Sequence, residues 1–398
     1  MKICMFAKGL PVHIKGGMEI YVEELAKGLV KRGHEVTIIT TKHPEGRKKE
    51  EEEGNLRIYY VGDKPLKYTR TFFKESIKLF KNLNEKNKFD IVHSQSGAGV
   101  AYALKCKKTA PLVITFQGTA LTEAKSLWNE GRFVKKAISV SILFRDFIHY
   151  FIFSHKYFYI RADKIIAVSN ELKEVIKMQY KVPEEKLVVI PNGIDINKFK
   201  PINVEDLRRE LSLGGKKAIL SVGAVHRQKG FHLLLNILPE ILKEEKDVKL
   251  VIVGSGPYLE NLKNIALKLG VSKNVLFIGS VSHEKLVKYY NLANIFAFPT
   301  LRYEGLPLVV PEAMACEKPV ITSRIGGIPT AIENGKDGFL IEPGNLKELR
   351  ERILEVLGDE ELARKLGENA RKKVLERFSL DRMVEDTIKV YDAVTSGR

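Results

Sequence analysis

The stretch Phe298–Val320, FPTLRYEGLPLVVPEAMACEKPV, decides the fold and the chemistry expected of this chain. The residues before it, Asn294–Pro299, form a short apolar run bounded by proline, which predicts a buried strand. Small residues after Glu312 predict a helix. We therefore expect Glu304 in a loop that leaves a strand, and Glu312 in the first turns of the following helix.

This connection places two carboxylates and the backbone amides of residues 305–308 at the carboxyl end of a predicted parallel sheet. Open α/β sheets bind their ligands at that edge, and N–H groups at the start of a helix favour phosphate. Carboxylates in this position can hold hydroxyl groups of a sugar while the amides hold an anion. The stretch therefore predicts a ligand site at the edge of the sheet.

Apolar runs of strand length alternate with helical patterns along the whole chain. Such alternation is typical of parallel sheets covered on both faces by helices. Strands are predicted in the first half at Lys2–Ala7, Glu35–Thr41, Leu56–Val61, Asp90–Gln95, Leu112–Phe116, Lys164–Ser169 and Leu187–Ile190. In the second half they are predicted at Ala218–Gly223, Lys249–Gly254, Val275–Gly279, Ile295–Pro299, Pro319–Thr322 and Gly338–Ile341. The two series predict an α/β protein with two doubly wound, Rossmann-like domains.

The run from Glu304 to Glu312 resembles the E-x7-E signature of retaining glycosyltransferases of the GT-B fold, in particular family 4. The Pro-Thr lead, the EGLPL turn and the EAMA helix carry the match. The resemblance implies two facing Rossmann-like domains with a cleft between them. It also implies transfer of a hexosyl residue from a nucleotide-diphosphate sugar to an acceptor hydroxyl, with retention of the anomeric configuration.

The run Pro191–Phe199 contains an Asn-Gly turn signal and looks like the inter-domain linker of this family. We expect an acceptor-binding domain at 1–195 and a donor-binding domain at 196–378. The resemblance implies that the final helix, within 379–398, returns to the first domain. The charged stretch Lys42–Glu53 is predicted to be a solvated loop.

The segment Pro11–Glu19 follows the first predicted strand and precedes a helix. Two glycines there, Gly16 and Gly17, let the backbone approach a ligand closely, and the helix start favours negative charge. The resemblance implies that this loop covers the donor diphosphate and touches the acceptor, with Glu19 among the matching positions. A simple tight turn is the alternative.

The segment Ser221–Gly230 carries the cations expected beside a diphosphate leaving group. Lys229 matches the lysine of the family, whereas the usual arginine position holds Ala224. We hypothesise that Arg227 supplies the missing guanidinium. The other reading makes Arg227 a surface charge.

Backbone-rich loops complete the donor site that the resemblance implies. Gly254, Ser280 and Val281 frame the nucleotide base, and the turn with Gly305, Leu306 and Leu308 offers amides to the diphosphate. Glu312 accepts hydrogen bonds from the ribose hydroxyls. Glu304 orients the transferred sugar beside Lys229 and Arg227. No metal ion is needed and no cofactor is expected, because the nucleotide sugar is a co-substrate.

Two strand ends of the first domain carry candidate acceptor residues. Gln117 stands where the family often has histidine; glutamine hydrogen-bonds a hydroxyl but takes up no proton at neutral pH. His93 either points into the same cleft or is a core histidine, and both alternatives stay open.

The composition bounds location and partners. The formal charge is +17, and the excess lies in residues 1–195, which hold 34 Lys/Arg against 22 Asp/Glu. This excess of positive charge can attract an anionic lipid, a nucleic acid or a phosphorylated acceptor. Alternatively, it reflects the Lys/Glu-rich composition of a thermophile. No nucleic-acid motif is evident, so no nucleic-acid partner is expected. The absence of a secretory signal and the three scattered cysteines predict a cytoplasmic protein.

The segment 125–161 combines many aromatic residues with seven basic and two acidic ones. It is too interrupted by charge to span a bilayer. One reading places it peripherally on the inner face of an anionic membrane, where it presents a lipid-linked acceptor. The other reading is a buried helix packed on the sheet.

Two rival functions share the predicted fold. A sugar-nucleotide epimerase needs no acceptor, and the E-x7-E run argues against it. A relative that binds sugar nucleotide with reduced catalysis is favoured by Ala224 and Gln117. The sequence leaves open the donor base and sugar, whether the acceptor is a glycan, a lipid-linked sugar or a small molecule, and the oligomeric state.

Overall fold

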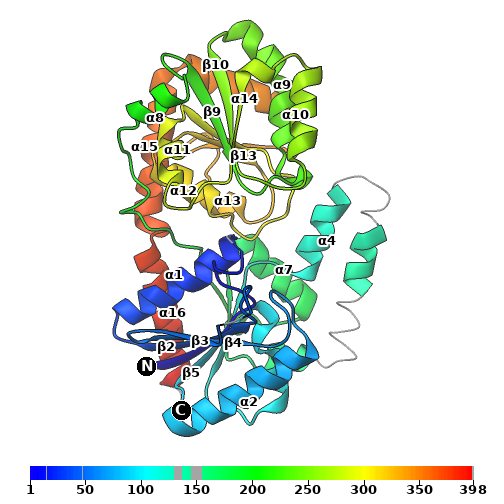
Figure 1. Cartoon of the computed structure of the whole chain (residues 1–398), viewed down its shortest axis with the longest axis vertical. Helices are drawn as coiled ribbons and strands as arrows, with labels where there is room; N and C mark the ends of the chain where they lie inside the picture. Colours follow the sequence, from blue (N-terminus) through cyan, green and yellow to red (C-terminus); the bar gives the residue numbers. More distant parts are fainter. Residues whose placement is uncertain (15, 47, 130–136, 145–154, 397–398) are drawn as a thin grey trace. The chain divides into compact units, whose positions relative to one another are not determined.

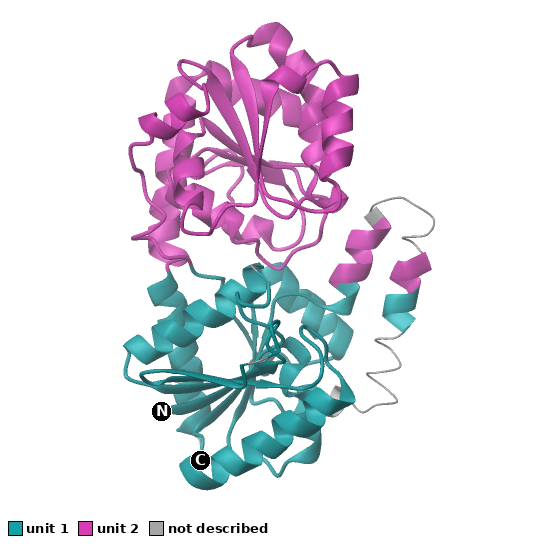
Figure 2. Ribbon diagram, viewed as in Figure 1, with its two compact units in different colours: residues 1–121, 141–193, 380–398 teal, residues 122–140, 194–379 magenta. Residues whose placement is uncertain are grey.

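The structure is a computed structural model that describes residues 1–14, 16–46, 48–129, 137–144 and 155–396 (Figure 1). The chain divides into two compact units (Figure 2). The first comprises residues 1–121, 141–193 and 380–398, and the second comprises residues 122–140 and 194–379. Each unit has its own sheet.

Eight strands among the described residues form the sheet of the first unit, in the order β3-β4-β2-β1-β5-β6-β7-β8. Every neighbouring pair is parallel except β3 with β4. The strands are β1 (Lys2–Phe6), β2 (Glu35–Thr41), β3 (Glu50–Glu53), β4 (Leu56–Val61), β5 (Ile91–Gln95), β6 (Leu112–Phe116), β7 (Lys164–Ala167) and β8 (Leu187–Val189).

The second sheet is wholly parallel, with six described strands in the order β11-β10-β9-β12-β13-β14. They are β9 (Lys217–Val222), β10 (Val248–Val253), β11 (Val275–Gly279), β12 (Ile295–Phe298), β13 (Val320–Ser323) and β14 (Phe339–Ile341). The strand order reverses between β9 and β12, which is where open parallel sheets bind ligands. The prediction of two doubly wound α/β domains is confirmed.

Helices fill the connections between these strands (Figure 1). In the first unit they are α1 (Gly17–Lys31), α2 (Arg70–Asn87), α3 (Val100–Lys105), α6 (His155–Arg161), α7 (Asn170–Tyr180) and α16 (Leu380–Thr395). Helix α4 (Ala120–Asn129) crosses the boundary between the units. In the second unit they are α8 (Glu205–Glu210), α9 (Phe231–Glu244), α10 (Leu259–Lys268), α11 (Leu286–Leu292), α12 (Val309–Ala315), α13 (Ile328–Ala331), α14 (Leu346–Gly358) and α15 (Glu360–Arg377).

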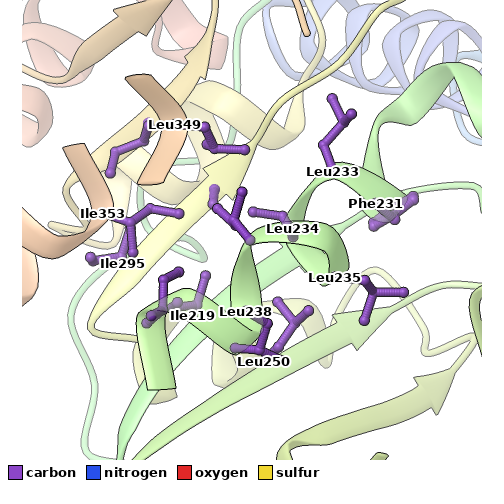
Figure 3. Packing of buried hydrophobic residues seen from close by; sticks show 14 of the residues in the cluster. Ile219, Phe231, Leu233, Leu234, Leu235, Leu238, Leu250, Ile295, Leu349 and Ile353 are labelled. Atoms are coloured by element: carbon purple, nitrogen blue, oxygen red, sulfur yellow. The ribbon is translucent and has the colours of Figure 1, made fainter. Parts of the chain in front are cut away.

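In the core of the second unit, buried side chains of helices pack against β9 and its neighbours (Figure 3). Leu234 and Leu238 of α9 are at most 2% exposed, and they belong to one cluster with Ile219 of β9 and Leu250 of β10. Ile353 of α14 joins the same cluster. Each such side chain contributes about 1.5–3 kcal/mol on burial. Strand ends fixed in this way position the loops that follow them.

The final helix, predicted within 379–398, is α16, and it packs on the first unit. Val384 lies against α1, where a Cβ atom on Gly28 would lie 2.5 Å from its Cγ2. Arg32 of α1 pairs with Asp381 at 2.9 Å. The helix therefore belongs to the core of the first unit, as the family resemblance implied.

The prediction of a loop over Lys42–Glu53 is wrong at its end, because residues 50–53 form β3. This strand pairs antiparallel with β4. Two of its glutamates accept hydrogen bonds from side chains of β4. Arg57 Nε donates to Glu52 at 2.9 Å, and the Tyr60 hydroxyl donates to Glu51 at 2.8 Å. Cross-strand partners stabilise this edge strand despite its four glutamates.

The unit boundaries fall at 193/194 and 379/380, close to the predicted 195/196 and 378/379. The larger difference is residues 122–140, which lie with the second unit. The contact runs through α4, because the Tyr303 amide donates to Ser126 Oγ at 2.8 Å. The Lys125 ammonium also lies 5.1 Å from the centre of the Tyr303 ring. Hence α4 touches the residue before Glu304.

Candidate active site

Two glycine-bearing loops meet at the carboxyl edge of the second sheet. Gly223 follows β9 and Gly254 follows β10, with φ of +149° and +142°. A Cβ atom on Gly254 would lie 1.9 Å from the carbonyl oxygen of Gly223, so no side chain fits there. A Cβ atom on Gly256 would lie 2.5 Å from the carbonyl oxygen of Val225. The loops therefore present bare backbone at Gly254 and Gly256, which is the condition for the close ligand approach predicted at Gly254.

The loop after β11 joins this edge through Ser280. Its Oγ lies 2.5 Å from Oγ of Ser255, and the amide of Gly254 donates to the carbonyl of Gly279 at 2.8 Å. Ser280 is exposed and Val281 is half-buried. The structure thus brings Gly254 and Ser280, two of the residues predicted to frame a base, to adjacent loops.

Lys229 and Glu304, which are 75 positions apart, form an ion pair at the same edge. Lys229 Nζ lies 2.7 Å and 2.9 Å from the two carboxylate oxygens of Glu304. The side chains are only 14% and 17% exposed, and the ammonium lies 5.3 Å from the centre of the Phe298 ring. The pair is thus partly shielded from water, which strengthens the electrostatic attraction between the two charges.

Glycines also fix the loops that carry this pair. Gly230, directly after Lys229, has φ of +77°, and a Cβ atom there would lie 1.9 Å from the carbonyl oxygen of Pro299. The backbone carbonyl of Glu304 accepts from the amide of Gly327 at 2.8 Å. A Cβ atom on Gly326 would lie 2.2 Å from that same carbonyl. The two charged side chains therefore stand on backbone held by neighbouring loops.

Arg227 opens the short 3₁₀ turn Arg227–Lys229, two residues from the lysine. It is half-buried, and Ala224 beside it is exposed. Burial, and then the charge of Arg227, lower the pKa of the nearby His232 to about 4. Among the described residues no carboxylate pairs with Arg227. The guanidinium therefore stands close to Lys229 along the chain without an anionic partner of its own.

Glu312 lies inside α12 and is 2% exposed. Its carboxylate has two partners: His283 Nε2 lies 2.7 Å from Oε1, and the Tyr290 hydroxyl donates to Oε2 at 2.7 Å. Burial, and then the neighbouring charge of Glu312, raise the pKa of Tyr290 well above its ordinary value. The phenol therefore keeps its proton and donates a hydrogen bond to the carboxylate.

His283 and Tyr290 were not predicted from the sequence. Their spacing of seven is two helical turns, but the helix α11 begins only at Leu286. A buried tyrosine and a histidine near a helix start are ordinary core features, so the signal was weak. Only the folded chain shows that both side chains reach Glu312.

The turn between the two glutamates contains Gly305, Leu306 and Leu308. The leucine side chains are 4% and 9% exposed, so they anchor the turn to the core. The amide of Glu312 donates to the carbonyl of Leu308 at 3.0 Å, as the first turn of α12. The predicted positions of Glu304 in a loop and of Glu312 in the next helix are confirmed.

In the first unit, Gly16 and Gly17 mark the start of α1. Glu19, in the first turn, is 8% exposed and folds back on the loop. A Cβ atom on Gly16 would lie 2.4 Å from Glu19 Oε2. Burial raises the pKa of the Glu19 carboxyl, with its own backbone amide and Lys8 acting in the opposite direction. The glycine therefore makes room for this carboxylate, and its contact with a ligand stays a prediction.

Gln117 and Asn192 form a reciprocal pair. Each side-chain amide donates to the oxygen of the other, at 2.9 Å in both directions. Asn192 belongs to the Asn-Gly turn before the unit boundary, so Gln117 ties the end of β6 to that turn. An acceptor role for Gln117 stays a prediction.

His93 lies wholly inside the core of the first unit. Its ring nitrogens lie 2.6 Å from the Tyr391 hydroxyl of α16 and 2.8 Å from Thr115 Oγ1. Burial lowers the pKa of His93 to about 3, so the ring is neutral. Of the two alternatives, this geometry favours the core histidine. We therefore do not include His93 among the proposed acceptor residues.

The segment 125–161 lies partly outside the described residues, which omit 130–136 and 145–154. At its end Phe158 is 1% exposed, and Tyr159 stacks on Tyr180 with ring centres 4.3 Å apart. Other described side chains are exposed, including Val140 at 57% and Phe144 at 65%. Membrane contact through this segment stays a prediction.

Two family models match the chain in succession. Residues 15–198 match Glycosyltransferase Family 4, and residues 203–373 match Glycosyl transferases group 1. An uncharacterised glycosyltransferase of Methanocaldococcus jannaschii is 31% identical over 98% of this chain and 98% of its own length. The chain belongs to glycosyltransferase family 4.

The GT-B fold of this family 4 glycosyltransferase is shared with solved structures. A sucrose-phosphate synthase from Thermosynechococcus elongatus superposes with a TM-score of 0.81 and 23% identity, and each chain is covered fully. A further relative is named as a GDP-mannose-dependent phosphatidylinositol monomannoside mannosyltransferase of Mycobacterium tuberculosis. It is 31% identical over 50% of this chain and 54% of its own length. Across the described part of this glycosyltransferase, each helix is too short or too polar to span a bilayer.

Proposed function

We propose that this chain is a retaining hexosyltransferase that moves a hexosyl residue from a nucleotide-diphosphate sugar to an acceptor hydroxyl. One observation carries the proposal. A cation–carboxylate pair and a second, buried carboxylate stand at the ligand-binding edge of one parallel sheet, beside loops of bare backbone. In this proposal Lys229 binds the diphosphate, Glu304 binds the transferred sugar, and Glu312 binds the ribose.

The proposed role of Glu312 is to bind the ribose. Each of its oxygens receives one hydrogen bond within the protein, from His283 and from Tyr290. A carboxylate oxygen accepts two hydrogen bonds, so each can take one more from a hydroxyl. Two adjacent ribose hydroxyls present that pair of donors.

The proposed role of Lys229 is to stabilise the leaving diphosphate. Its ammonium has three hydrogens, and Nζ lies within hydrogen-bond distance of both carboxylate oxygens of Glu304. Glu304 therefore does not use up the donors of Lys229, and a phosphate oxygen can be bound as well. Fixed donors placed where charge develops are usually the largest catalytic contribution. The backbone amides of Gly305, Leu306 and Leu308 are proposed to add to it.

Glu304 is proposed to hold hydroxyls of the transferred sugar and to face the positive charge that develops at its anomeric carbon. We propose a front-face substitution, in which the acceptor hydroxyl gives its proton to the leaving phosphate. Lys229 and Arg227 offset the diphosphate charge, so the proposal includes no metal ion and no cofactor.

The acceptor is proposed to be a sugar or a lipid-linked sugar. The support is the name of the mycobacterial relative, which specifies a phosphatidylinositol monomannoside, and the +17 charge of the chain, which suits an anionic acceptor. Gln117 and Glu19 remain the candidate acceptor residues.

Thermal stability against a nucleotide panel tests the proposal. We expect one of UDP, GDP and ADP, free or carrying glucose, N-acetylglucosamine or mannose, to raise the melting temperature. A ligand at 100 times its Kd adds about 2.7 kcal/mol to the free energy of unfolding. Lys229→Ala should abolish the shift, whereas Lys263→Ala, which removes an exposed lysine of α10, should keep it. No shift with any nucleotide would refute a sugar-nucleotide site.

A separate variant tests whether Arg227 replaces the arginine that the family usually has at the position of Ala224. We expect Arg227→Ala to weaken binding of the nucleoside diphosphate about 10-fold, because a hydrogen bond to a charged group contributes roughly 1.5–3 kcal/mol. Binding of the corresponding nucleoside, which lacks the phosphates, should be unchanged. Titration calorimetry with both ligands measures the difference. Equal diphosphate affinity in the variant and the wild type would make Arg227 a surface charge.

A further inference from the structure

The carboxylate of Glu312 is the end of a chain of hydrogen bonds that begins outside the sheet. Lys198 Nζ lies 3.0 Å from His283 Nδ1, and His283 Nε2 lies 2.7 Å from Glu312 Oε1. Lys198 stands near the start of the second unit, four residues after Ile194. A residue of the segment that joins the two units is thus connected to the candidate ribose site.

The direction of each hydrogen bond follows from its members. A lysine ammonium only donates, so Nδ1 of His283 accepts. A neutral imidazole then carries its hydrogen on Nε2, which donates to Glu312 Oε1. Tyr290 donates to the other oxygen. Lys198 therefore selects the one tautomer of His283 that holds the carboxylate.

Packing holds these groups in place. Phe199 is 1% exposed, and its ring centre lies 5.2 Å from that of His283 and 5.9 Å from that of Tyr290. The Lys198 ammonium lies 5.3 Å from the Phe199 ring. The backbone before it is also fixed, because Asp195 Oδ1 accepts from the amide of Lys198 at 3.2 Å. The lysine thus has a defined direction toward the histidine.

We propose that Lys198 and His283 are positioning residues, which orient the Glu312 carboxylate so that its remaining lone pairs meet two adjacent ribose hydroxyls. The inference rests on the proposed function, because it assumes a nucleotide at this edge. In this way a residue of the segment that joins the two units sets the geometry of the ribose contact.

Binding titrations with paired nucleotides test this role. The ligands are UDP, GDP or ADP, whichever stabilises the wild type, and its 2′-deoxy form. We expect the wild type to prefer the ribonucleotide about 10- to 100-fold, the value of one hydrogen bond to a charged group. In Lys198→Met and His283→Leu this preference should fall toward one, mainly through weaker binding of the ribonucleotide.

Conservative and matched variants complete the test. His283→Gln keeps an N–H donor for Glu312 and should retain much of the preference. Lys200→Met makes the same charge change at an exposed position and should bind both ligands as the wild type does. Lys198 is half-buried, so Lys198→Met carries the test if His283→Leu fails to fold.

The outcomes separate the two proposals. If Lys198→Met and His283→Leu weaken both ligands equally and keep the wild-type preference, the residues are merely structural and the inference is wrong. An unchanged Kd for both ligands in these variants also overturns it, while the proposed function stands. A wild type that binds none of the nucleotides overturns both.

Discussion

Replacing Lys229 by alanine should lower the turnover number about 100- to 1000-fold, the usual effect of losing one fixed donor at a developing charge. The same change leaves the Glu304 carboxylate, 17% exposed, without its cation at 2.7 Å. An unpaired carboxylate beside a diphosphate leaving group repels it as charge builds. The release of nucleoside diphosphate from the donor found in the thermal panel measures this turnover.

The control for Lys229→Ala is Lys263→Ala, since Lys263 is an exposed lysine of α10 that pairs only with Glu260 among the described residues. Its turnover should equal that of the wild type. The double variant Lys229→Ala/Glu304→Ala should lose less than the two single changes predict together, because residues in direct contact are not additive. Turnover within threefold of wild type in Lys229→Ala would contradict the assigned role.

Replacing Glu312 by alanine should weaken nucleotide binding by at least about 100-fold. Two ribose hydroxyls lose their acceptors, and a hydrogen bond to a charged group is worth roughly 1.5–3 kcal/mol. The free base and the inorganic diphosphate lack the ribose, so their weak binding should not change. Titration calorimetry with the nucleotide measures the loss.

The same variant should also melt at a lower temperature. Tyr290 is fully buried, and removal of Glu312 leaves its hydroxyl without an acceptor. An unsatisfied buried group costs about 1–3 kcal/mol, which lowers Tm by several degrees in a unit of this size. Glu284→Ala, at an exposed neighbouring position, serves as the control for both measurements. Wild-type affinity in a folded Glu312→Ala protein would place the ribose elsewhere.

Most strands could be predicted because they contain apolar residues and are buried on both faces. Runs such as Ile91–Gln95 and Leu112–Phe116 are buried along their whole length, so alternation of apolar runs with helical patterns was enough. β3 could not be found in this way, because it consists of four glutamates, two of which are stabilised by side chains of another strand. Arg57 and Tyr60 supply those partners only after the chain has turned.

The site was partly predictable for a different reason. Glu304, Glu312 and Lys229 occur in local patterns, so their places at strand ends follow from the sequence and from the family they resemble. The partners of Glu312 occur in no such pattern. His283 lies 29 positions from it, and a histidine near a helix start has many ordinary uses. Contacts of that kind exist only in the folded chain.

The bare backbone at Gly223 and Gly254 limits how such a protein diversifies. A side chain at position 254 would collide with a carbonyl 1.9 Å away, and the φ of +149° at Gly223 is one that residues with a side chain rarely adopt. Both glycines are therefore hard to replace by a new recognition group. Variation is left to neighbouring positions, such as the exposed Ala224 in the loop after β9 and the exposed Ser280 in the loop after β11. Descendants of this chain can therefore change the nucleotide they prefer by few routes, and directed evolution of that preference would be most productive as a small library at those positions.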